Sequence, residues 1–155
     1  LSSTFDLNDK LQSDVLLIET AGLCHRCSPA TEQMAAGCVL DCTSSCHAPA
    51  QLGPMLTYAD FVVLTKIDMV SQAEREIILW KIKELNPTAK LFTVDGLTGY
   101  GAEGLADWLS CFSKETNFDD DVLRHSMPSG VCSYCVGEKR VGSAYQQGVV
   151  GKIEF

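Results

Sequence analysis

A lysine and a carboxylate follow an apolar run in the segment Thr65-Lys66-Ile67-Asp68. Residues 61–64 are Phe, Val, Val and Leu, a pattern typical of a buried parallel strand that carries polar residues to its carboxyl end. A carboxylate at that position can accept hydrogen bonds from the N1–H and the exocyclic amine of guanine, while the lysine stem lies along the base. Adenine offers no such pair of donors, so the segment favours GTP over ATP. The alternative is an ordinary strand with a polar end.

Two other segments carry residues that a nucleotide-hydrolysing site needs. Residues 14–22 form an apolar run that reaches Glu19 and, three positions later, Gly22. An acid there can hold Mg²⁺, and a glycine lets its backbone N–H approach a γ-phosphate closely. Residues 90–101 predict a short strand followed by a glycine-rich loop. Because open α/β sheets bind ligands at the carboxyl ends of their strands, the three segments together predict a nucleotide site.

The order of these segments resembles the C-terminal half of the metal-chaperone GTPases. This family serves nickel insertion into hydrogenase and urease and includes the cobalamin-synthesis-type zinc chaperones. The resemblance covers about residues 14–112 and is carried by Glu-x-x-Gly at 19–22, Thr-Lys-x-Asp at 65–68 and the glycine-rich residues 97–101. It implies a partial P-loop NTPase fold, with GTP and Mg²⁺ as ligands.

The resemblance also implies a role for each motif. Glu19 would anchor Mg²⁺ and the Gly22 amide would sense the γ-phosphate, which makes these two residues the candidate catalytic pair. The other two motifs would contact guanine, one along the base and its N1 edge and the other at its O6 edge. The candidate nucleotide-binding residues are Thr65, Lys66, Asp68, Leu97 and Thr98.

A phosphate-binding loop is missing from this sequence. GTPases of this class need Gly-x-x-x-x-Gly-Lys-[Ser/Thr], and the one Gly-Lys pair here, Gly151-Lys152, is followed by isoleucine. The chain also begins with Leu1 rather than methionine. We expect it to be the C-terminal part of a longer protein or one piece of a split protein. A missing N-terminal half or a partner chain would supply the loop, and this chain alone would be inactive as a GTPase.

Eight cysteines are the second unusual feature of the sequence. A nucleotide-binding α/β pattern favours a reducing compartment, where clustered thiols bind metal more often than they form disulfides. Four thiolates suit zinc or an iron–sulfur cluster, and mixed cysteine and histidine ligands suit zinc or nickel; we favour the cluster. Cys38 and Cys111 are expected in the core. The candidate metal ligands are Cys24, Cys27, Cys42, Cys46, Cys132 and Cys135.

The resembled family places a metal ligand in a Cys-Pro-Ala segment just after Glu-x-x-Gly. Here the matching residues are 27–30, Cys-Ser-Pro-Ala, with one residue inserted. Cys132 and Cys135 lie far beyond this segment and supply only two ligands, so they would complete the first cluster or pair with a second copy across a dimer. A redox-active dithiol is the alternative, although a thioredoxin-type strand and helix are absent around it.

Composition limits the remaining possibilities. The sequence is 46% hydrophobic with a net charge of −8, which argues against nucleic-acid or anionic-membrane binding. It contains no signal peptide or membrane-spanning run, and we expect a cytoplasmic protein. We expect one α/β domain over residues 1–113, a linker over 114–129 and a small Cys-x-x-Cys tail over 130–155.

The expected architecture is a three-layer parallel sheet flanked by helices. The predicted strands lie near 15–19, 38–41, 61–65 and 91–94, and the predicted helices near 28–36, 50–58, 72–85 and 102–113. The functional hypothesis is a GTP-dependent metallochaperone or metal-centre maturation factor, as a homodimer that serves a client metalloenzyme. The alternative is a non-catalytic, cysteine-rich module on a degenerate GTPase scaffold that stores a metal or carries electrons.

Overall fold

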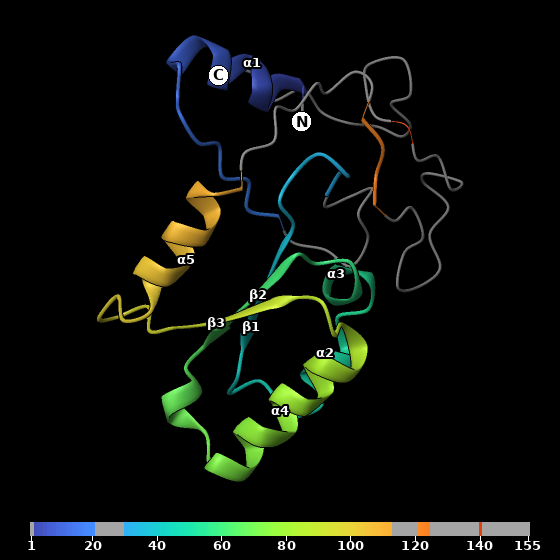
Figure 1. Cartoon of the computed structure of the whole chain (residues 1–155), viewed down its shortest axis with the longest axis vertical. Coiled ribbons are helices and arrows are strands. Elements are labelled where there is room, and N and C mark those ends of the chain that lie inside the picture. Colours follow the sequence, from blue (N-terminus) through green and yellow to red (C-terminus); the bar gives the residue numbers. More distant parts are fainter. Residues whose placement is uncertain (1, 21–29, 113–120, 125–139, 141–155) are drawn as a thin grey trace. The chain divides into compact units, whose positions relative to one another are not determined.

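The computed structural model describes residues 2–20, 30–112, 121–124 and 140. The chain divides into two compact units, which are described separately. One comprises Leu1–Gln33 with Thr116–Phe155, and the other comprises Met34–Glu115. Within the described ranges, every strand belongs to the second unit, which we call the sheet unit (Figure 1).

Three parallel strands form the centre of the sheet unit. They are β1 (Gly37–Asp41), β2 (Phe61–Thr65) and β3 (Lys90–Val94), in the order β1-β2-β3. Gly37 pairs with Phe61, and Phe61 pairs with Lys90. The three inner residues of β2 are buried, because this strand has a neighbour on each side and a helix layer below it. The expectation of an α/β fold with a parallel sheet is confirmed.

The helices of the sheet unit cover both faces of the sheet. Figure 1 shows α4 (Gln72–Leu85) and α2 (Ala48–Gln51) on one side and α5 (Ala102–Ser110) on the other. The remaining helical segments are α3 (Pro54–Thr57) and the single 3-10 turn η1 (Ile67–Met69).

The longest helix, α4, starts and stops where its sequence dictates. The Ser71 hydroxyl accepts from the Glu74 N–H, while the Glu74 carboxylate accepts from the Ser71 N–H, a capping box. At the other end the buried Asn86 amide donates to the carbonyls of Leu56 and Ala59, at 2.8 and 2.9 Å. The boundaries 72–85 expected from the sequence are confirmed.

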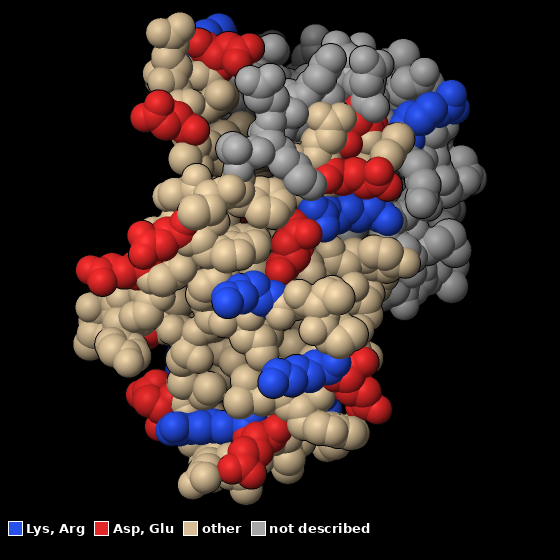
Figure 2. Space-filling model, viewed as in Figure 1, with Lys and Arg blue, Asp and Glu red and all other residues tan. Residues whose placement is uncertain are grey.

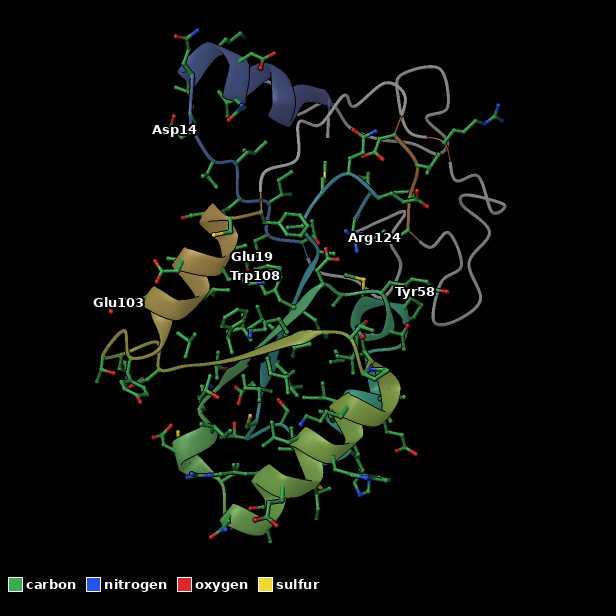
Figure 3. All side chains as sticks on the ribbon, viewed as in Figure 1. Asp14, Glu19, Tyr58, Glu103, Trp108 and Arg124 are labelled. Carbon is green, nitrogen blue, oxygen red and sulfur yellow. The ribbon has the colours of Figure 1, made fainter. Side chains whose placement is uncertain are left out.

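The core lies on the α4 face of the sheet. Its buried members are Cys38, Leu40, Cys42, Ala48, Leu56, Ala59, Val62, Leu64, Ile78 and Ile82. The opposite face is aromatic: Trp108 points from α5 toward the sheet, with ring centroids 5.2 Å from Phe61 and 5.8 Å from Phe92 (Figure 3). The two faces together hold the strand ends rigidly in place.

The first unit begins with a helix that the sequence analysis did not predict, α1 (Ser2–Leu11). The strand predicted near 15–19 is wrong: residues 15–20 belong to no helix or strand, and Leu17 is 80% exposed. A strand needs a neighbouring backbone for its hydrogen bonds, and no described residue pairs with this segment.

The helix predicted near 28–36 is also wrong over its described part, residues 30–36. Thr31 instead forms an antiparallel bridge with Leu123, and the Arg124 side chain donates to the Thr31 carbonyl at 2.7 Å. Residues 28 and 29 lie outside the described ranges. Long-range pairing therefore decides the structure here against local helix propensity.

Two further boundaries differ from the prediction. The helix expected over 50–58 is split into α2 and α3, because Gly53 has a φ of +53° and Pro54 begins a new helix. The helix expected over 102–113 ends at Ser110, and Cys111, expected in the core, is exposed. In the described part of the chain, no helix has the length and apolar character needed to cross a membrane.

Candidate functional site

The carboxyl ends of the three parallel strands form the candidate site. β1 ends in Asp41, β2 leads into Lys66 and Asp68, and β3 leads into Asp95. Since β2 is paired with both neighbours in register, the three strand ends lie side by side at one edge of the sheet. This edge is where open α/β sheets bind ligands.

The turn after β2 is tied to the end of β1. The Thr65 carbonyl accepts from the Cys42 N–H at 3.1 Å, and the Thr65 hydroxyl donates to the Leu40 carbonyl at 3.4 Å. Lys66 follows with φ +54° and ψ +30°, the left-handed region, which turns the chain sharply out of the strand into η1. Asp68 is exposed on η1, so its carboxylate can meet a ligand from solution.

The Lys66 ammonium forms an ion pair with Asp41 at 2.6 Å. Asp41 also accepts from the Thr43 N–H at 2.9 Å and from the Thr43 hydroxyl at 2.7 Å. These hydrogen bonds, with that from Lys66 the largest cause, lower the pKa of the Asp41 carboxyl to about 2. Asp41 is therefore an anion at any physiological pH.

Sequence reasoning did not assign Asp41 to the site. Its signal was available, because residues 38–41 show the same pattern as residues 61–68: an apolar run with an acid at its end. What the sequence alone could not give is the pairing with Lys66, which depends on β1 and β2 being neighbours in the sheet.

The loop after β3 is braced by Asp95. Its carboxylate accepts from the Leu97 N–H at 2.9 Å and from the Thr98 hydroxyl, and these bonds, the hydroxyl first, lower the pKa of Asp95. The Tyr100 carbonyl accepts from the Asp95 N–H at 2.9 Å, which closes the loop. Leu97 is 98% exposed at its tip. The loop thus holds Leu97 and Thr98 in a defined position beside the strand end, as an Asx turn does.

Glycine is required where this loop meets α5. Gly101 has a φ of +83°, and a Cβ there would lie 2.0 Å from the Thr93 carbonyl oxygen. An open hollow beside the loop is lined by Thr93, Thr98, Gly101 and Glu103 among others. Glu103, one of the lining residues, points away from the sheet (Figure 3).

Two of the predicted metal ligands, Cys42 and Cys46, lie among the described residues. Cys42 is buried in the core, and burial, with a smaller contribution from the Asp41 charge, raises the pKa of its thiol. Burial also raises the pKa of Cys38 to about 11, which confirms that cysteine as a core residue. Among the described residues, no group of three or more possible ligands lies close enough to hold a metal ion.

All but one of the remaining predicted site residues belong to the other unit; Cys46 belongs to the sheet unit. Glu19 is exposed on the extended segment before residue 21, so its carboxylate is accessible. Gly22 and four of the predicted metal ligands lie outside the described residues: Cys24, Cys27, Cys132 and Cys135. Cys46 is described, partly buried and packed against the core of the sheet unit.

Charged side chains of both signs cover the helix layer of the sheet unit. In the view of Figure 2, acidic and basic side chains alternate over the lower part of the molecule, where α4 lies.

Three comparisons with known proteins bear on this site. A family model described as "CobW/HypB/UreG, nucleotide-binding domain" matches residues 3–93, which include Glu19, Gly22 and residues 65–68. The uncharacterized protein MJ0120 of Methanocaldococcus jannaschii is 43% identical over 145 residues, 94% of this chain and 62% of that protein. The chain therefore spans less than two thirds of this relative. The crystal structure of hydrogenase maturation factor HypB from Archaeoglobus fulgidus matches 46% of this chain and 41% of its own, with 26% identity and a TM-score of 0.41.

Proposed function

The chain belongs to the CobW/HypB/UreG nucleotide-binding domain family, and we propose that it is part of a GTP-dependent metallochaperone or metal-centre maturation factor. The observation that carries this proposal is the position of Lys66 and Asp68 directly after the central buried strand of a parallel sheet. The segment that would contact the guanine base is held on one side by the hydrogen bonds of Thr65 and on the other by the 3-10 turn η1.

Guanine recognition is assigned to two neighbouring strand ends. The exposed Asp68 carboxylate accepts from the N1–H and the exocyclic amine, which adenine cannot match. The Lys66 stem lies along one face of the base. Leu97 and Thr98 bound the O6 edge, and the Asp95 hydrogen bonds that fix their loop support this assignment.

GTP hydrolysis is assigned to the segment after residue 18. The exposed Glu19 carboxylate would hold Mg²⁺, which would supply positive charge to stabilise the phosphates during hydrolysis. The Gly22 amide would donate to the γ-phosphate. Water attacks the γ-phosphorus, the bond to the bridging oxygen breaks, and GDP and phosphate leave. Loss of the γ-phosphate contact releases the segment that follows Gly22.

The cargo is a metal ion or an iron–sulfur cluster bound by thiolates. Cys24 and Cys27 follow Gly22 closely in sequence, so a change at the γ-phosphate would reach them directly. Cys132 and Cys135 would complete the ligand set or pair across a homodimer, and Cys42 and Cys46 are the remaining candidates. The recipient is a client metalloenzyme, and the compartment is the cytoplasm.

Nucleotide binding needs a phosphate-binding loop from outside this sequence. We therefore define the assembled protein as this chain together with the polypeptide that carries the loop. The chain alone is expected to bind GTP weakly and to turn none over.

The nucleotide assignment is tested by titrating the assembled protein with GDP, ADP and XDP. Asp68→Asn should weaken GDP binding about 10- to 100-fold, because charge-assisted hydrogen bonds are lost, and should improve XDP binding, because an amide can donate to the 2-oxo group of xanthine. Glu84→Gln removes one exposed charge from α4 and serves as the matched control. Equal binding of GDP and ADP by the unaltered protein would refute the guanine assignment.

The cargo assignment is tested by metal and acid-labile sulfide analysis of the anaerobically purified chain. Stoichiometric iron with sulfide would indicate a cluster, and zinc or nickel without sulfide would indicate an ion. A protein with bound metal but no GTP turnover in the assembled state would favour the non-catalytic storage or electron-transfer module instead.

A further inference from the structure

The end of β1 presents a carboxylate whose orientation is fixed before any ligand arrives. Asp41 is the last residue of that strand and stands opposite Thr65 in the register. One of its oxygens accepts both hydrogen bonds from Thr43, at 2.9 and 2.7 Å. The other oxygen accepts from the Lys66 ammonium at 2.6 Å. One carboxylate oxygen is therefore occupied by Thr43, and the other is oriented to accept the Lys66 ammonium.

The backbone of Lys66 is held in an unusual conformation as well. Among the described residues, only Gln12 and Lys66 combine a side chain with a positive φ. The left-handed region is disfavoured for residues with a Cβ, and such residues persist where the surroundings determine them. At Lys66 those surroundings are the Thr65 hydrogen bonds on one side and the ion pair with Asp41 on the other.

We propose that Asp41 is a positioning residue for guanine recognition, which holds the Lys66 ammonium so that the lysine stem is already placed for the base beside Asp68. The proposal rests on the proposed function of the same site. It adds to that function a residue on a different strand, whose carboxylate acts through Lys66 and makes no contact with the nucleotide.

A role in orientation fits this ion pair better than a role in stability. The Lys66 and Asp41 side chains are 54% and 35% exposed, and ion pairs in such settings contribute little to folding. A free lysine side chain populates many rotamers, and ordering it on ligand binding reduces affinity. Holding the ammonium beforehand removes that cost from the binding step.

The test compares Asp41→Asn with Glu84→Gln in the assembled protein. The asparagine keeps the size and the Thr43 hydrogen bonds but loses the charge that holds Lys66. GDP affinity should fall about fivefold, as expected for loss of one exposed ion pair. Thr43→Val removes one bond that orients Asp41 and should lower GDP affinity by a smaller factor. Glu84→Gln should leave GDP affinity unchanged.

A second measurement does not depend on nucleotide. In the full chain, the ¹⁵N signal of the Lys66 ammonium should be protected from fast hydrogen exchange, and Asp41→Asn should abolish that protection. An unprotected Lys66 in the unaltered chain would overturn the proposal.

The binding outcomes separate this proposal from the proposed function. Selective GDP binding that Asp41→Asn leaves unchanged, or tightens, overturns the positioning role alone; tighter binding would mean that Asp41 competes with the base for Lys66. Absence of GDP selectivity in the unaltered assembled protein refutes the proposed function, and the positioning role falls with it. Preference for GDP over ADP in the unaltered protein, with lower GDP affinity in Asp41→Asn and no change in the control, supports both.

Discussion

Two apolar runs of similar composition have opposite structures in this chain. Residues 61–65 form β2, the central strand of the sheet, with Val62 and Leu64 fully buried. Residues 15–19 contain four valine, leucine and isoleucine residues against three in β2, yet they form no strand, and Leu17 is 80% exposed. Both runs lead into polar residues that were assigned to the nucleotide site, Glu19 to Mg²⁺ and Lys66 with Asp68 to guanine.

The difference lies in the neighbours of each run. β2 has a parallel partner on each side and α4 against one face, so its backbone groups are hydrogen-bonded and its apolar side chains are buried. The segment 15–19 pairs with no described residue. Strand propensity measures the fit of a side chain to a pleated, half-buried surface, so it has no effect without that surface. An apolar run therefore predicts a strand only together with its partners.

Hydrogen exchange tests this contrast most strongly. Amides of Val63 and Leu64 should exchange only on global unfolding, whereas those of residues 15–18 should exchange almost freely, a difference of at least about 1,000-fold. The measurement is amide exchange by NMR on the full chain. Strong protection of residues 15–18 would mean that this run forms a strand in solution, and the contrast with β2 would then be wrong.

A matched pair of truncations gives the next largest effect. Leu64→Ala should lower the free energy of unfolding by about 2–5 kcal/mol, because it leaves a cavity in the core. Leu17→Ala should change it by less than about 0.5 kcal/mol, because that side chain is exposed. Urea unfolding followed by circular dichroism measures both. Equal losses would show that Leu17 is buried against a partner.

The part of the fold that was predictable is the part with strong local signals. Strands β1, β2 and β3 follow from apolar runs, and helix α4 follows from its apolar face and from Asn86-Pro87, which end it. The segment at 30–36 was not predictable, since Thr31 pairs with Leu123 far along the chain. Helix α1 (Ser2–Leu11) was not predicted from the sequence.

The candidate site divides in the same way. Lys66 and Asp68 could be found from the sequence, because the residues that matter follow one another directly after a strand. The contact of Asp41 with Lys66 could not be predicted from the sequence, because the two residues are 25 positions apart and meet only because β1 and β2 are neighbouring strands. The cysteine clusters were visible as spacing, but spacing could not show that Cys42 is buried in the core.

Contact with the β3 backbone also determines the conformation of the loop after β3, and substitutions at two glycines test this contact. Gly101→Ala should cost about 1–3 kcal/mol of stability, because φ is +83° and the new Cβ would meet the Thr93 carbonyl. Gly104→Ala is the control: nothing lies within 4 Å of its Cβ position in α5, so it should stabilise by up to about 1 kcal/mol. Thermal unfolding measures both. A neutral Gly101→Ala would mean that the loop does not rest against β3.

The smallest expected effect concerns Asp41, where the neighbouring ends of β1 and β2 bring two side chains together. Its pKa is lowered to about 2 in the folded chain, below about 3.9 for an unperturbed aspartate. The folded state therefore binds this proton less readily than the unfolded state does. The stabilisation that the ionised Asp41 provides is complete above about pH 4 and is lost as the pH falls through about 2.

Titration of the Asp41 carboxyl carbon by NMR should give a midpoint at about pH 2. Lys66→Met should raise this midpoint, because the Lys66 hydrogen bond is the largest cause of the lowered pKa. An unchanged midpoint in Lys66→Met would mean that Asp41 and Lys66 do not form an ion pair in solution. The pairing of β1 with β2 would then not bring these two side chains together at the site.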